Sequence, residues 1–225
     1  MPNHCWNKLN VVGSQEAVDA FGKKYINQTQ DQYKDKFLDF EKVIPMPQGL
    51  DVKKSSYAEE LYNLLYRIKE VEMNPSLLQD NFSLYFILSE LKEKGKTPEE
   101  AAAEIIEKFP EAKELAEQYH SNFQKFGATD WYEWRVKYWD TKWNSYDCYF
   151  KTDEHGIAIT FSTAWSPCTP VMKKLIEDNP ELTFSYEYDE PGMQFRGSIE
   201  GSNGQVTKDH YEEYEYQEEE DEEDE

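Results

Sequence analysis

The hydrophobic period of this chain changes twice, and those changes limit the possible folds more than any other feature. Residues 7–12 are a predicted strand, residues 55–143 follow a helical pattern, and apolar residues alternate with polar ones from residue 146 onward. A period of two indicates a strand with one buried face, and a period of 3.6 indicates an amphipathic helix. The chain should therefore form a sheet from two distant segments, with a helical block inserted between them.

Local signals mark the elements before the block. Ser14 can cap a helix that begins at Gln15, because its hydroxyl accepts a hydrogen bond from a free N–H group of the first turn. The segment 37–44 is predicted to be extended, and Pro45 ends it. The inward stripe of the first helix is expected at Val18, Phe21 and Tyr25.

The block contains start and stop signals for several helices. Thr97 should cap one helix, and Glu100 completes its capping box. The Pro-Ser pair at 75–76 should open the preceding helix, which Gly95 ends. Two more helices are expected at about 110–126 and 130–139. The apolar stripe of the first helix in the block is Tyr57, Leu61, Leu64, Leu65 and Ile68.

The second half of the chain predicts strands around one helix. Residues 146–150 and 157–161 alternate, and the stretch 153–156 between them suits a tight hairpin turn. A helix should begin at Thr169 and end before Asn179.

Further strands are expected at 182–188 and 193–199, joined by a type II turn at Pro191-Gly192. Residues 202–204 suit another tight turn. A last short strand could cover 211–216, unless that stretch is already tail.

The order strand, helix, insertion, two strands, helix, strand predicts a fold class. It is the βαββαβ plan of ferredoxin-like α+β proteins, with a mostly antiparallel sheet and two helices on one face. We expect a helical insertion and a disordered acidic C-terminal tail. The expected division is 1–50 and 144–211 for the ferredoxin-like domain, 51–143 for the insertion and 212–225 for the tail.

Charge narrows the class of partner. The net charge is −22, and residues 212–225 hold eleven acids and no base, which leaves −11 for residues 1–211. Nucleic-acid binding is therefore not expected, because it depends on Lys and Arg neutralising phosphates. An acidic exterior should attract basic proteins. The alternative is that the tail only promotes solubility.

The sequence also indicates a compartment. The N-terminus lacks the basic start and apolar stretch of a signal peptide, and no run approaches the roughly 20 apolar residues of a spanning helix. We expect a cytoplasmic protein without a membrane association. Its three cysteines, Cys5, Cys148 and Cys168, should then be free thiols.

Catalytic, cofactor and metal sites are not predicted. The chain lacks a dinucleotide fingerprint, a phosphate-binding loop and a nucleophile elbow. His4 and Cys5 are adjacent, so a strand would point them in opposite directions, and a metal would need further ligands. Cys168 precedes a helix N-terminus, which would stabilise a thiolate, and His155 is a conceivable base. A pair alone is not a triad, and we expect a structural cysteine.

Aromatic and basic residues gather in one segment and form a candidate interaction patch. Such a mixture can stack on and neutralise single-stranded nucleic acid, although no RNA-binding signature accompanies it. The alternative, which we favour, is that these aromatics pack inside the protein. The patch comprises Trp131, Trp134, Arg135, Trp139, Lys142, Trp143 and Trp165.

Five segments resemble a known family. They are PNHCWNKLNVVG (2–13), FEKVIPMP (40–47), WYEWRVKYWDTKW (131–143), FSTAWSPCTPV (161–171) and YEYDEPGMQFRG (186–197). In this combination and order the chain resembles the YubB-like, ferredoxin-like-domain proteins of bacterial plasmids and phages. The resemblance implies a ferredoxin-like fold and a bacterial cytoplasmic setting. It implies no catalytic residue, because the family has no established activity.

The function that these observations favour is a non-enzymatic module that binds a basic protein partner. Such a partner could belong to host defence or to DNA metabolism. Two alternatives stay open: an enzyme of unrecognised type with a site between insertion and sheet, and single-stranded nucleic-acid binding through the Trp-rich segment. The oligomeric state does not follow from the sequence.

Overall fold

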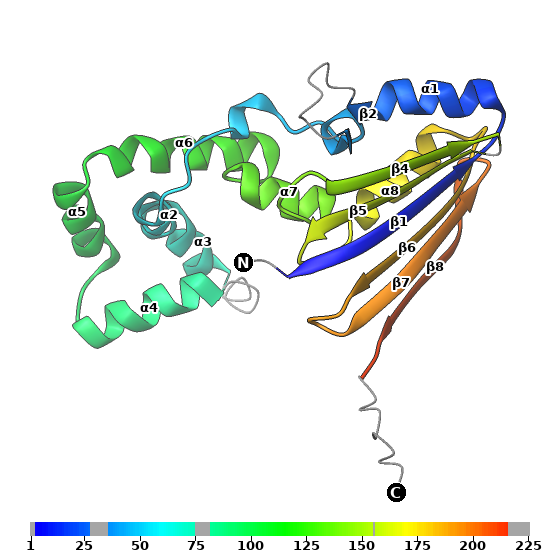
Figure 1. Cartoon of the computed structure of the whole chain (residues 1–225). Coiled ribbons are helices and arrows are strands. Elements are labelled where there is room, and N and C mark those ends of the chain that lie inside the picture. The colour runs from blue at the N-terminus through cyan, green and yellow to red at the C-terminus, as the bar shows by residue number, and fades with distance from the viewer. Residues whose placement is uncertain (1–2, 28–35, 75–81, 155, 216–225) are drawn as a thin grey trace, which may run out of the picture. The chain divides into compact units, whose positions relative to one another are not determined.

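A computed structural model describes residues 3–27, 36–74, 82–154 and 156–215 (Figure 1). The chain divides into a sheet unit, Met1–Met46 with Arg135–Glu225, and a helical unit, Pro47–Trp134. The boundary falls inside α7 (Trp131–Trp139), earlier than the expected position of 143. The reason is that Trp139 belongs to the sheet unit: its Nε1 donates to the Ile44 carbonyl at 2.9 Å, and its ring meets Phe40 edge-on.

The sheet unit contains a six-stranded sheet in which every neighbouring pair is antiparallel. The order across the sheet is β4-β5-β1-β6-β7-β8. The strands are β1 (His4–Val12), β4 (Tyr146–Asp153), β5 (Gly156–Ala164), β6 (Thr183–Glu190), β7 (Phe195–Ser202) and β8 (Gln205–Glu213). Strands β1, β4, β5 and β6, with the helices that follow β1 and β5, form the predicted ferredoxin-like plan. Strands β7 and β8 extend the sheet beyond β6.

Two helices cover one face of the sheet. α1 (Gln15–Tyr25) begins where predicted, since the Ser14 hydroxyl accepts a hydrogen bond from Ala17 N–H. On α1, Phe21 contacts Phe184 of β6, and on α8 (Thr169–Asp178) Ile176 lies against Gly201, the β7 partner of Phe184. Both helices therefore bury the same face, on which the odd-numbered residues of β1 lie.

The segment predicted as extended over 37–44 is wrong for most of its length. Only Phe37–Leu38 form a strand, β3, which pairs with β2 (Ile26–Asn27). Phe40–Lys42 form a 3₁₀ turn, because the Asp39 carboxylate accepts from Glu41 N–H at 3.1 Å and competes with strand pairing. This turn places Phe40 in the core.

The loop between β6 and β7 differs from the type II turn predicted at Pro191-Gly192. Such a turn needs a positive φ at Gly192, whereas the residue with positive φ is Gln194, at 59°. The Glu190 carboxylate accepts hydrogen bonds from Gly192 N–H and Met193 N–H. These bonds stabilise a longer loop in place of the tight turn.

The last strand begins earlier than predicted. Asn203 and Gly204 have φ values of 53° and 72°, which makes the hairpin that starts β8 at residue 205. The tail predicted from residue 212 is also wrong at its start, because 212–213 belong to β8 and the Tyr214 hydroxyl donates to Asp189 at 2.7 Å. The rest of the predicted tail, residues 216–225, lies outside the described residues.

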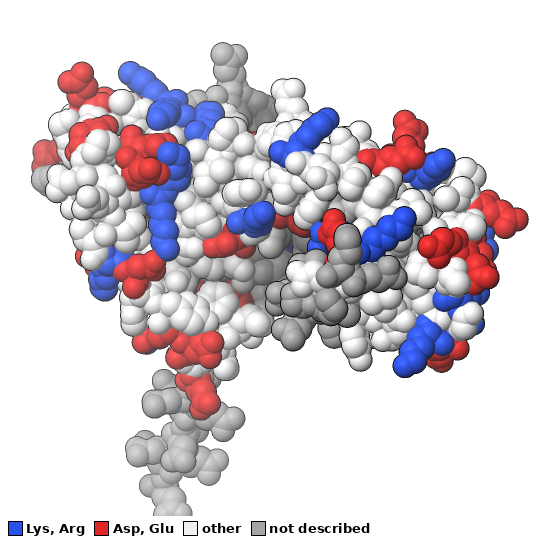
Figure 2. All heavy atoms as spheres, turned by 180° about the vertical axis from the view of Figure 1, so that it is seen from behind, with Lys and Arg blue, Asp and Glu red and all other residues white. Residues whose placement is uncertain are grey.

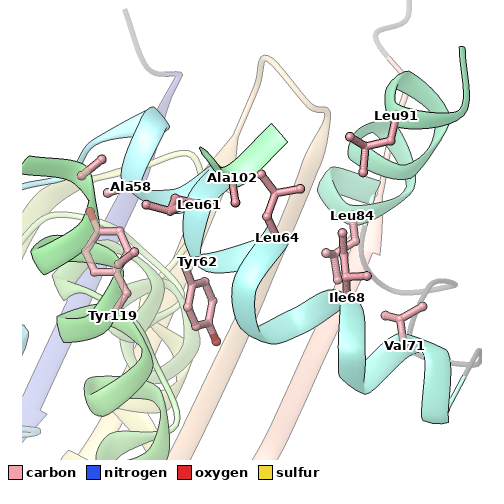
Figure 3. Packing of buried hydrophobic residues seen from close by; sticks show 12 residues of the cluster. Ala58, Leu61, Tyr62, Leu64, Ile68, Val71, Leu84, Leu91, Ala102 and Tyr119 are labelled. Carbon is pink, nitrogen blue, oxygen red and sulfur yellow. The ribbon is translucent and has the colours of Figure 1, made fainter. Parts of the chain in front are cut away.

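The helical unit has its own core, shown in Figure 3. The Thr97 capping box is confirmed, and Gly95 takes the expected left-handed conformation. The helix start predicted at 75–76 lies outside the described residues. The predicted inward stripe includes Tyr57, but this side chain is exposed and stacks on Phe109. The helices are α2 (Ser56–Tyr62), a π-helical turn (Asn63–Arg67), α3 (Ile68–Met73), α4 (Phe82–Lys94), α5 (Pro98–Lys108) and α6 (Glu111–Phe126), after a 3₁₀ turn at Gln48–Leu50.

None of the helices in the described ranges combines the length and the apolar character that crossing a bilayer requires.

Candidate functional site

The second face of the sheet carries side chains that α1 and α8 do not cover, and we call it the open face. Along β1, residues 5, 7, 9 and 11 are buried, whereas His4 and Trp6 are exposed. The strand register places the open-face residues in three rows from β4 to β8. The rows are Tyr146, Ser162, Trp6, Asp189, Arg196, Glu212; then Tyr149, Thr160, Lys8, Glu187, Ser198, His210; then Lys151, Ala158, Asn10, Ser185, Glu200, Lys208.

One end of the open face is aromatic. Trp6 is 44% exposed, and on the same side of β1 the His4 Nδ1 lies 2.8 Å from the Tyr146 hydroxyl. The Tyr146 ring meets the Trp143 ring edge-on. The backbone N–H of Trp165 donates a hydrogen bond to the Asn3 carbonyl, next to the start of β1. Exposed aromatic rings at the end of a sheet offer a surface for stacking and cation–π contacts.

Beside Trp6 the open face is hollowed into a groove of about 260 Å³. We call it the Trp6 groove. Three of its lining side chains are carboxylates on β6 and β8: Glu187, Asp189 and Glu212. The remaining lining residues are Trp6, Tyr188, Arg196, Gly197, Ser198 and His210.

The three carboxylates differ in how they are held. Glu212 pairs with Arg196, and that hydrogen bond lowers the pKa of Glu212. Asp189 accepts from the Tyr214 hydroxyl. Glu187 makes no hydrogen bond or ion pair with another described residue, so its charge is open to a ligand. The groove is thus lined by an exposed indole ring, that of Trp6, and by the carboxylate of Glu187, which forms no ion pair with another described residue.

Lys and Arg side chains are mixed with Asp and Glu side chains on the face that Figure 2 shows, with many uncharged residues between them. The open face follows the same pattern: Lys8 lies opposite Glu187 in the register, and Lys208 pairs with Glu200.

The structure divides the predicted Trp-rich patch into buried and exposed residues. Trp134 and Trp139 are only 5% and 0% exposed, so these two cannot contribute to a binding surface. Arg135 pairs with Glu41 and lies over the Trp139 ring, with its guanidinium carbon 4.8 Å from the ring centroid. The internal packing alternative therefore holds for these three residues.

The other four residues of the patch lie elsewhere. Trp131 is half-buried in the helical unit against Tyr132, while Trp143 and Trp165 are exposed in the sheet unit. Lys142 lies over the Trp143 ring at 4.4 Å. The predicted patch does not include Trp6, although its position between the inward residues Cys5 and Asn7 in an alternating strand indicates an exposed ring.

The possibility of a reactive thiolate at Cys168 is wrong. Its side chain is fully buried, and burial raises the pKa of this thiol, which opposes formation of a thiolate. Burial likewise raises the pKa of Cys5 to about 12. His155, the conceivable base, lies outside the described residues.

His4 and Cys5 point to opposite faces of β1, as expected for neighbours in a strand. His4 lies on the open face beside Tyr146, and Cys5 lies in the core. Within the described ranges, no three His, Cys, Asp or Glu side chains are grouped so that they could hold a metal ion.

Comparison with known proteins finds one family model that matches part of the chain and one similar solved structure. Residues 138–225 match the family described as the ferredoxin-like domain in Api92-like protein. The crystal structure of the protein Api92 from Yersinia pseudotuberculosis is similar over 97% of this chain and 100% of that chain, with 11% sequence identity and a TM-score of 0.47. No curated protein sequence matches the chain.

Proposed function

We propose that this chain is a non-enzymatic interaction module that binds a basic segment of another protein on its open face. The observation that supports this most is the Trp6 groove, where an exposed indole ring lies beside the carboxylate of Glu187, which forms no ion pair with another described residue. A Lys or Arg side chain gains from both groups, since its charge is attracted to the ring face and to the carboxylate.

The charge of the whole chain supports the same class of partner. A net charge of −22 attracts basic proteins over several ångströms before contact and repels nucleic acids. The exposed residues of the predicted patch, Trp143 and Trp165, would extend the contact beyond the groove at the aromatic end of the face. Aromatic side chains of this kind commonly supply much of the binding energy at protein interfaces.

Titration of the full chain with a fluorescent peptide rich in Lys and Arg tests the proposal. We expect Trp6→Ala and Glu187→Gln each to weaken binding by roughly tenfold at low salt, as for the loss of a cation–π or ionic contact. Glu16→Gln is the matched control, because it removes one negative charge from an exposed position of α1, which lies on the other side of the sheet from the open face. Raising the salt concentration should weaken binding of the unmodified chain.

Two results would overturn the proposal. One is equal affinity of the peptide for the unmodified chain, Trp6→Ala and Glu187→Gln. The other is tighter binding to a single-stranded oligonucleotide than to the basic peptide at physiological salt, which would favour the nucleic-acid alternative.

The biological setting belongs to the same proposal and rests on the sequence resemblance. We propose membership of the YubB-like family, an origin on a bacterial plasmid or phage, and action in the bacterial cytoplasm. The basic partner would then be a protein of host defence or DNA metabolism. Affinity capture from bacterial lysate with the unmodified chain and with Glu187→Gln would test this: it requires a basic protein that only the unmodified chain retains.

A further inference from the structure

Strand β8 forms one edge of the sheet, and its outer side is open. The sheet order ends at β8, so no other strand among the described residues pairs with it. All residues of β8 except Glu212 are exposed. An exposed edge strand presents backbone N–H and C=O groups that another extended segment can pair with.

The direction of these backbone groups follows from the end of the strand. Tyr214 N–H donates to the Gln194 carbonyl at 2.8 Å and so points toward the β7 side. Alternate residues of an antiparallel strand direct their backbone groups to the same side. The N–H groups of Asp209, Tyr211 and Glu213 therefore point away from β7, toward the open edge.

From Lys208 to Glu213 the edge lacks two of the devices that prevent strand pairing, proline and a bulge, and its protection rests on charged side chains that a basic strand would not be repelled by. Natural edge strands are often protected by proline or by a bulge. β8 contains no proline, and its register shift lies at its start, between the pairs Gly201–Val206 and Glu200–Lys208. From Lys208 to Glu213 the strand pairs regularly with β7, so six consecutive residues present an unbroken edge.

We infer that β8 binds the basic segment of a protein partner as an added antiparallel or parallel strand. This inference rests on the proposed function and names how the partner is bound. Charge complementarity selects the occupant: from Asp209 to Glu215, the described C-terminal end of the sheet unit holds four acids and no Lys or Arg. Backbone pairing along β8 would lay an extended Lys- and Arg-rich segment beside these acids and next to His210 and Glu212 of the Trp6 groove.

A pair of variants at one position tests the inference. Tyr211→Pro removes a backbone N–H group that points outward. The proline ring itself is tolerated at such a position of an edge strand. Tyr211→Ala removes the same aromatic side chain and keeps the N–H group. The probe is a twelve-residue peptide of alternating Lys and Thr, compared with a peptide of equal charge in which Pro replaces every second Thr.

We expect Tyr211→Pro to bind the Lys-Thr peptide about tenfold more weakly than Tyr211→Ala, and the Pro-containing peptide to bind all variants weakly. A second measurement does not depend on the variants: amide hydrogen exchange at Asp209, Tyr211 and Glu213 of the unmodified chain should slow when the Lys-Thr peptide is added.

Equal affinities of Tyr211→Pro and Tyr211→Ala, together with unchanged exchange at these amides, would overturn strand addition. If Glu187→Gln still weakened peptide binding, the proposed function would stand while this inference failed. If the unmodified chain bound neither peptide, both would fail.

Discussion

Asn7 is a polar side chain at the centre of an apolar core. It is fully buried, and its amide nitrogen donates to the Cys5 carbonyl at 2.9 Å and to the Thr163 hydroxyl at 3.0 Å. Its amide oxygen accepts from the Tyr186 hydroxyl at 2.5 Å. This network links β1, β5 and β6, so one side chain connects three strands of the ferredoxin-like plan.

Replacing Asn7 with alanine should strongly destabilise the sheet unit. The change leaves the buried hydroxyl of Tyr186 without this acceptor and opens a small cavity, which together reduce the free energy of unfolding by about 2–3 kcal/mol. Asn10→Ala is the control, because Asn10 lies on the open face of the same strand. Urea unfolding measures both; equal stabilities would contradict a structural role for the network.

The buried cysteines should resist alkylation in the folded protein. Burial raises the pKa of Cys5 to about 12 and raises the pKa of Cys168 as well, so both thiols stay protonated at pH 8. Cys148, which is half-buried, should react first with iodoacetamide, and all three should react in urea. Mass spectrometry of the modified peptides gives the order, and early modification of Cys168 would contradict it.

The same thiols should make stability depend on pH in the alkaline range. An unfolded cysteine ionises near pH 9, whereas folded Cys5 keeps its proton until about pH 12. Stability from this group is therefore complete below pH 9 and falls as pH rises from 9 toward 12. Cys5→Ala should flatten the decrease in the unfolding free energy over that range, and an unchanged slope would contradict the assignment.

At the scale of elements, the contact between α8 and β7 depends on a glycine. A Cβ atom on Gly201 would lie 2.6 Å from Ile176 Cγ2 and 2.7 Å from its Cδ1. The helix can approach the strand only because residue 201 has no side chain. The buried side of α8 thus needs a matching space on the sheet, which hydrophobic periodicity alone does not reveal.

Gly201→Ala should therefore reduce the free energy of unfolding by about 1–3 kcal/mol through overpacking. In an Ile176→Val background, which removes the Cδ1 methyl, the reduction should be smaller. Ser198→Ala on the open face of the same strand should change stability by less than about 0.5 kcal/mol. Thermal unfolding measures the series, and a neutral Gly201→Ala would show that the helix shifts freely.

The Thr97 capping box offers a test in the helical unit. The Thr97 hydroxyl accepts from Glu100 N–H at 3.2 Å, and the Glu100 carboxylate accepts from Thr97 N–H at 2.9 Å. Thr97→Ala should destabilise the start of α5 by about 1 kcal/mol. Amide exchange at Glu100 and Ala101 should accelerate about fivefold, whereas Ser89→Ala on the exposed side of α4 should leave it unchanged.

For the whole molecule, the end of β8 decides which of the C-terminal acids are shown to belong to the sheet unit. Residues 212–215 belong to the sheet unit through β8 and the Tyr214 contacts. The eight acids at 218–225 follow that point in the chain. Deleting from residue 216 and deleting from residue 212 are therefore different experiments.

Deletion of 216–225 should slow association with the basic peptide roughly tenfold at low salt, because long-range attraction weakens. The melting temperature should not change, and the difference in rate should vanish at high salt. Deletion from residue 212 should lower the melting temperature as well, since it removes part of β8. Stopped-flow fluorescence measures the rates; equal association rates for the full chain and the shorter deletion would contradict electrostatic steering.

The sequence by itself determined the order of the main sheet and helix elements, the ferredoxin-like plan and the helix caps at Ser14 and Thr97. These features depend on local periodicity and on side chains within four residues of one another, as at Ser14 and Thr97. It could not determine the turn at 40–42, the extent of β8 or the burial of Trp139. Each of those depends on contacts between residues far apart in the chain, such as Trp139 with Phe40 and Glu212 with Arg196. Only the tertiary structure brings Trp6 beside Glu187, because strand register sets which exposed side chains become neighbours.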